Sequence, residues 1–91
     1  MKRPRFNWSR NWSTDPKNRL CYGGWLVGLI HPDGAGWRWH TEEYSDPLMT
    51  PPAWMSCVPT VMSITLYDTP AEARAGLEAF LRPRLRGVQT D

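Results

Sequence analysis

The sequence predicts an α+β domain: a small three-stranded antiparallel sheet with one C-terminal helix packed on one face, and an extended basic N-terminal arm. Three observations predict it. Residues 25–44 resemble a β-hairpin, residues 60–67 are rich in β-branched and apolar side chains, and residues 70–81 have a helical period. A chain of 91 residues can bury one modest core. We divide it into an arm (1–19), a single domain (20–86) and a frayed C-terminal tail (87–91).

The hairpin is expected to consist of a first strand over residues 20–30 and a second over residues 37–44. The turn between them contains Pro32, Asp33 and Gly34, which favour tight turns through a fixed φ, a bond back to the backbone and a positive φ. If Trp37 lies near His31, the helix-facing side carries Trp25, Val27, Leu29, Trp37 and Trp39. The other side then carries Leu26, Gly28 and Ile30 beside Arg38, His40, Glu42 and Tyr44. This mixed side, flat at Gly28, is our candidate binding face.

The third strand and the helix follow each other directly. Residues 60–67 are expected to be a half-buried strand. Thr69 is expected to cap the helix by accepting from the N–H of Glu72, and Pro70 fits the first helical position. The apolar stripe consists of Ala73, Leu77, Phe80 and Leu81. Pro83 disfavours a helical residue before it, so the helix is expected to end there.

The N-terminal arm is strongly basic. Residues 1–20 hold six basic groups and one acidic group, whereas residues 21–68 hold one basic and five acidic groups. Such an arm is expected to meet something negative, whether nucleic acid, an acidic protein surface or the body of the domain itself.

Two tryptophans in the arm, Trp8 and Trp12, belong to a short near-repeat. Their rings either cover the small core or, together with the arginines, bind single-stranded nucleic acid or a partner groove. We expect a mixed outcome in which Trp12 is packed while Arg3, Arg5 and Trp8 are free to bind.

The loop over residues 45–55 contains three prolines and several apolar side chains. A loop of this length is more often functional than a mere connector. Its apolar members are Leu48, Met49, Trp54 and Met55. They either pack under the sheet or form an adaptable patch for a partner.

Catalytic and metal-binding motifs are not found. The four soft ligands, Cys21, His31, His40 and Cys57, are separated by 10, 9 and 17 residues, whereas structural zinc sites usually use closely spaced pairs. No nucleophile stands in a recognisable arrangement with a base, and no glycine-rich phosphate loop precedes a helix. We therefore expect no enzyme activity, no cofactor and no metal.

The function predicted from these features is that of a small protein-binding module, an inhibitor or adaptor that occupies a surface of a larger partner. Tryptophan and arginine are enriched at binding hot spots. By analogy, inhibitors and adaptors that are encoded by phages or mobile elements often have such small, tryptophan-rich chains. The candidate partner-binding residues are Arg3, Arg5, Trp8, Arg10, Arg38, His40, Tyr44, Met49 and Trp54. The alternative is a nucleic-acid-binding accessory protein that uses the arm. Without a signal-peptide or membrane-spanning pattern, we expect a cytoplasmic protein.

Overall fold

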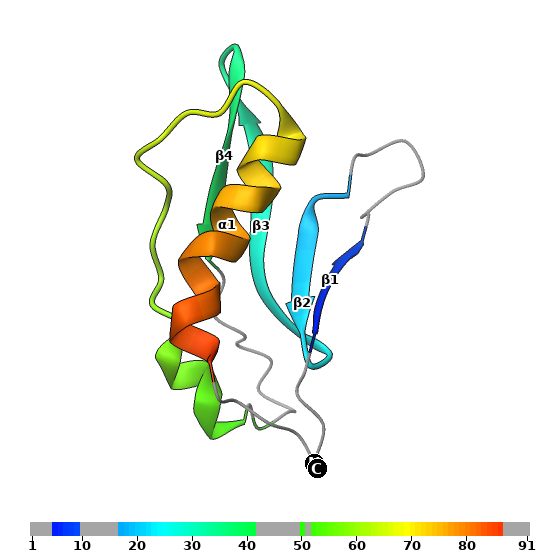
Figure 1. Ribbon diagram of the computed structural model, residues 1–91, viewed down its shortest axis with the longest axis vertical. Coiled ribbons are helices and arrows are strands. Elements are labelled where there is room, and N and C mark those ends of the chain that lie inside the picture. Colours follow the sequence, from blue (N-terminus) through cyan, green and yellow to red (C-terminus); the bar gives the residue numbers. More distant parts are fainter. Residues whose placement is uncertain (1–4, 10–16, 42–49, 51, 87–91) are drawn as a thin grey trace.

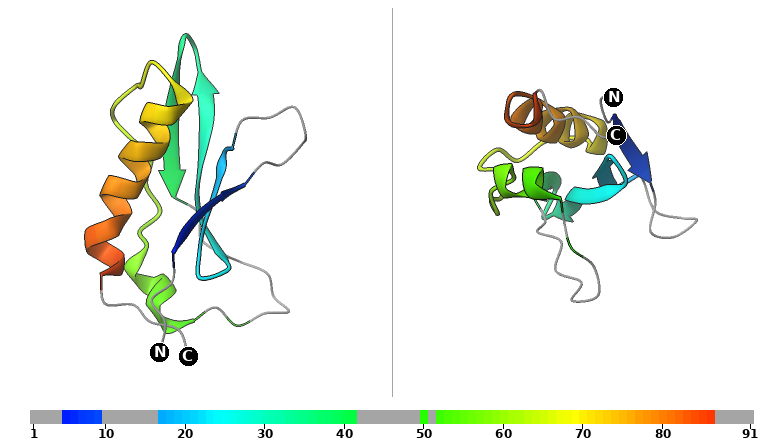
Figure 2. Two further views of the ribbon diagram at one scale, coloured as in Figure 1. Left: turned by 45° about the vertical axis from the view of Figure 1, so that its right-hand side comes forward. Right: turned by 90° about the horizontal axis from the view of Figure 1, so that it is seen from below.

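The computed structural model describes residues 5–9, 17–41, 50 and 52–86, and it confirms an α+β fold. Its elements are β1 (Phe6–Ser9), β2 (Arg19–Tyr22), β3 (Trp25–Asp33), β4 (Gly36–Thr41), the 3-10 helix η1 (Ala53–Cys57) and α1 (Pro70–Leu85). The strands form one antiparallel sheet in the order β1-β2-β3-β4. Helix α1 crosses one face of this sheet, as Figure 1 shows, so the domain has two layers (Figure 2).

The sheet has four strands and not the predicted three, partly because the expected first strand is a hairpin. Gly23 and Gly24 have φ values of +60° and +84°, and Tyr22 pairs with Trp25 across them. Two consecutive positive φ values are what a two-residue hairpin turn requires, and glycine adopts them without strain. The Gly-Gly pair between two apolar runs was therefore a hairpin signal.

The additional strand is β1, which lies within the predicted arm. It pairs with β2 and places Trp8 opposite Leu20. Trp8 is half-buried against the core, and its indole Nε1–H donates to Glu78 Oε2 on α1 at 2.9 Å. The expectation of a free Trp8 is therefore wrong, because pairing with β2 turns its ring toward the helix. Trp12 lies outside the described residues.

The register of the β3–β4 hairpin differs by one residue from the one we assumed. Trp37 is paired with Pro32 and not with His31, because only Gly34 and Ala35 form the turn, with φ of +62° at Gly34. A one-residue shift exchanges the two faces of a strand. Gly28 and Ile30 therefore join the two β4 tryptophans on the helix side, while Leu29 lies on the opposite side.

A β-bulge in β3 keeps Val27 in the core. Leu20 pairs with Gly28, but the next residue of β2, Cys21, pairs with Leu26. Val27 is thus the extra residue of the bulge, and it is completely buried. Because a bulge changes the alternation of side chains along its strand, Val27 and Gly28 can both contribute to the side covered by α1.

The predicted third strand over residues 60–67 is wrong. Residues 59–67, here called the edge segment, run beside β4 but make only two isolated bridges, between His40 and Met62 and between Trp37 and Tyr67. From one bridge to the other, β4 advances by three residues, whereas the edge segment advances by five. The two extra residues interrupt the ladder, so the segment covers the edge of β4 without becoming a strand.

Helix α1 begins as predicted but ends later. The Thr69 hydroxyl accepts from the N–H of Glu72 at 3.2 Å. The helix continues through Pro83 to Leu85, which contradicts the expected end. In the last turn proline costs only one helical hydrogen bond, while the helical conformation allows complete burial of Leu85.

The core lies between α1 and the sheet. Its buried residues are Leu20, Tyr22, Val27, Ile30, Trp39, Val58, Ala73, Leu77, Leu81 and Leu85. Trp54 and Met55 of η1 pack against this core, and the Trp54 ring meets Tyr22 edge-on, with centroids 5.5 Å apart. These two residues therefore pack against the core and do not form a free patch; Leu48 and Met49 lie outside the described residues.

We predict that Gly28→Ala destabilises the domain by about 1–3 kcal/mol, the usual cost of overpacking a core. A Cβ at this position would lie 2.8 Å from Leu77 Cδ2 and 3.0 Å from the His40 carbonyl oxygen. Urea denaturation measures the loss. In a Leu77→Val background the same change should cost less, because the crowding methyl group is gone. An equal cost in both backgrounds would contradict the proposed contact.

We predict that Trp8→Phe lowers the free energy of unfolding by about 0.5–1.5 kcal/mol, the usual value of one hydrogen bond. The change keeps a packed ring but removes the donor to Glu78. The matched control is Trp8→Phe in a Glu78→Ala background, where the further loss should be small. If Trp8→Phe leaves the urea midpoint unchanged, this hydrogen bond does not hold β1 to α1.

Candidate functional site

Of the nine predicted partner-binding residues, the structure brings Arg38 and His40 together on β4. Trp8 and Trp54 are half-buried against the core, and Arg5 is exposed just before β1. The other four, Arg3, Arg10, Tyr44 and Met49, lie outside the described residues. The surface around Arg38 and His40 is therefore the part of the predicted site whose contacts the structure describes.

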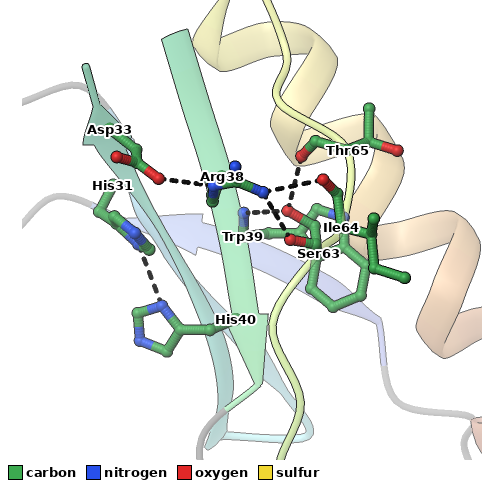
Figure 3. A network of polar contacts seen from close by, with 8 residues as sticks. All are labelled: His31, Asp33, Arg38, Trp39, His40, Ser63, Ile64 and Thr65. Carbon is green, nitrogen blue, oxygen red and sulfur yellow. Dashed lines mark hydrogen bonds and ion pairs between the residues drawn. The ribbon is translucent and has the colours of Figure 1, made fainter.

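The face of the sheet opposite α1, here called the outer face, carries these two residues. His31 is paired with Arg38, and Leu29 with His40, so these four side chains share one face. His31 and His40 are diagonal neighbours on adjacent strands. Their Nδ1 atoms are 3.1 Å apart and their ring centroids 5.0 Å apart, and Figure 3 shows the two rings turned toward each other. We call them the histidine pair.

The electrostatics of the outer face favour a neutral His31. Burial lowers its pKa below the usual value, and the nearby His40 and Arg38 lower it further, against the opposing effect of Asp33. A neutral imidazole has one N–H donor and one acceptor nitrogen. The short Nδ1–Nδ1 contact therefore needs a proton on only one of the two facing nitrogens.

Arg38 connects the hairpin to the edge segment. Its Nε donates to Asp33 Oδ2 at 2.5 Å, and its Nη1 donates to the carbonyl oxygens of Ser63 and Ile64 at 2.9 and 2.8 Å (Figure 3). These carbonyls belong to the stretch where the ladder with β4 is interrupted. The guanidinium thus satisfies backbone acceptors that β4 does not reach, and holds this stretch in one conformation.

Ser63 and Thr41 provide further attachments along the same edge. Ser63 donates its N–H to the Trp39 carbonyl at 2.8 Å, and its hydroxyl accepts from the Trp39 N–H at 3.2 Å. The Thr41 hydroxyl donates to the Pro59 carbonyl and accepts from the Val61 N–H at 2.7 Å. Both side chains are buried. The edge segment is therefore held at several points, although it has no regular secondary structure.

The edge segment carries an apolar row, which we define as Val61, Met62, Ile64 and Leu66. Among the described residues, every large hydrophobic side chain that is exposed belongs to this row. Ile64 is 96% exposed and Met62 57%, and the Ile64 side chain points away from β4 (Figure 3). Beside the row lies an open hollow of about 560 Å³, lined by His31, His40, Thr41, Thr60, Val61 and Met62.

The sequence reasoning missed both the histidine pair and the apolar row. The assumed register placed His31 opposite Trp37, which would separate it from His40. Reading residues 60–67 as a regular strand implied that alternate side chains are buried. The sequence offers no clear sign of the two extra residues that expose Ile64, because they become visible only when the segment is aligned with β4.

Comparisons with known proteins give no information on this surface. No family model matches the chain, and comparisons with curated proteins and with solved structures found no significant match. Within the described residues, no helix has the length and apolar character to cross a membrane, and no three or more His, Cys, Asp or Glu side chains form a group suited to a metal ion. The outer face and the edge segment are therefore the features from which a function can be inferred.

We predict that Arg38→Gln loosens the edge segment. The shorter, uncharged side chain loses the ion pair with Asp33 and the bonds to the two carbonyls, so the amide of Ser63 should exchange with solvent at least about tenfold faster, equivalent to roughly 1.4 kcal/mol. Hydrogen exchange followed by NMR measures this. Asp33→Asn is the matched control, since it leaves Arg38 bonded to both carbonyls. Equal exchange rates in the wild type and Arg38→Gln would show that Arg38 does not hold the segment.

Proposed function

We propose that this chain is a small non-enzymatic protein-binding module, of the inhibitor or adaptor type, that inserts its apolar row into an apolar hollow on a larger protein. The observation that supports this most directly is the 96% exposure of Ile64 on a segment fixed by Arg38. Hydrogen bonds hold the backbone of Ser63, Ile64 and Thr65, and the Ile64 side chain is therefore kept in water. An apolar side chain in water does not stabilise the free protein. Its exposure is explained if a partner covers it.

The energetics of such docking are favourable. Complete burial of an exposed isoleucine yields about 1.5–3 kcal/mol, and Met62 and Leu66 add further apolar area. Because Arg38 and Ser63 already hold the backbone, little conformational entropy is lost on binding. A projecting, preorganised aliphatic group of this kind fits a concave and apolar partner surface.

The alternative proposal is a nucleic-acid-binding accessory protein. It has less support from the described part of the chain, where several helix arginines interact with their own domain. Arg82 pairs with Glu78 at 2.7 Å, and Arg84 lies 3.7 Å above the Phe80 ring. The basic N-terminal arm is the feature that supports this alternative. Salt dependence distinguishes the two proposals, because binding through phosphates weakens steeply with salt, whereas binding through an apolar interface does not.

We predict that Ile64→Asp weakens partner capture while the domain remains folded. The experiment is a pull-down from the source cell with nuclease present, followed by affinity measurements on the purified partner at two salt concentrations. Ile64→Asp should weaken binding at least about tenfold, because it removes buried apolar area and introduces a charge. Unchanged far-UV circular dichroism would exclude unfolding as the cause.

The matched control is Thr65→Asp, which introduces the same charge at the neighbouring exposed position and should reduce binding much less. Equal affinities for the wild type and Ile64→Asp would refute the docking surface. Loss of all capture on nuclease treatment, with a steep salt slope, would favour the nucleic-acid alternative instead.

A further inference from the structure

We propose that His31 and His40 form a bidentate site for an exchangeable divalent transition metal of the zinc class, bound through the Nδ1 atoms of both rings. This inference is independent of the proposed docking function. The two Nδ1 atoms lie 3.1 Å apart. A zinc ion at the usual 2.0–2.1 Å from two nitrogens in tetrahedral geometry separates them by about 3.3 Å. The observed separation of the two donor atoms is therefore within about 0.2 Å of the one that a bound zinc ion requires.

The donor atoms suit this metal class. Imidazole is a ligand for zinc, nickel and copper, whereas magnesium and calcium prefer oxygen. The two rings stand on adjacent paired strands, β3 and β4, so the sheet fixes their separation before any metal arrives. Because the chain contains only these two histidines, all imidazole coordination must come from this pair.

The position of the pair determines the kind of site. Both rings line the open hollow beside Thr60 and Met62, so solvent can reach a metal ion and water can fill its remaining coordination positions. Structural zinc sites usually have four protein ligands. With two protein ligands, this one should be weaker and exchangeable. The fold should not depend on it, since both rings lie on the outer face of the sheet, away from the core between α1 and the sheet.

The spacing of the two histidines in the sequence does not reveal this site. His31 and His40 are nine residues apart, outside the close spacings that mark zinc motifs. In an antiparallel hairpin, two ligands lie close together when the register makes them direct or diagonal neighbours, whatever their separation in the sequence. The observed pairing of His31 with Arg38 places His40 at the diagonal position.

The test is a titration of the unaltered chain with zinc chloride, followed by NMR of the histidine rings. We expect saturation at one zinc per chain and coordination shifts at Nδ1 of both rings, with the Cβ signals of Cys21 and Cys57 unchanged. Zinc shifts at the cysteines alone, at one ring alone or at Nε2 would overturn the proposal.

Variants provide the second measurement. Isothermal titration calorimetry with zinc chloride should show that His31→Gln and His40→Gln each weaken binding about 100-fold, because two ligands held on one scaffold gain this much over one. Thr60→Ala, which alters the hollow but removes no imidazole, is the matched control and should bind like the wild type. Wild-type affinity in both histidine variants would refute the site. The ring shifts of the unaltered chain decide the question if a variant does not fold.

Discussion

The close approach of α1 to the sheet at Gly28 is the contact on which the rest of the structure depends. Leu77 comes so near to this glycine that a Cβ would lie 2.8 Å from its Cδ2 atom. The contact brings the completely buried Leu77 directly against β3. Gly28 lies on the covered face of the hairpin, and the register therefore places the histidine pair and Arg38 on the outer face.

The second constraint is the edge of β4. An unpaired strand edge attracts other chains, and here the edge segment covers it. The segment has two residues more than a regular strand would need, and Arg38 binds the carbonyls at that stretch. The carbonyls of Ser63 and Ile64 thereby have a donor inside the domain, while the Ile64 side chain faces water. Protection of the edge and presentation of an apolar side chain thus have the same structural cause.

The two proposals concern neighbouring parts of one surface. Met62 belongs to the apolar row and lines the same hollow as His31 and His40. A partner that covers Ile64 would therefore lie close to the histidine pair and could limit access of solvent to it. The two activities are nevertheless separable, because docking depends on apolar area and metal binding on the two imidazole rings.

The sequence by itself determined the α+β class, the Thr69 cap and the apolar stripe of α1, because these features depend on residues close together in the chain. The double glycine at Gly23 and Gly24 also encodes the first hairpin. Only the tertiary structure decided the hairpin register, the place of β1 in the sheet and the exposure of Ile64. Each of these depends on pairing between distant segments, where a shift of one or two residues changes the exposed side chains without changing the local pattern.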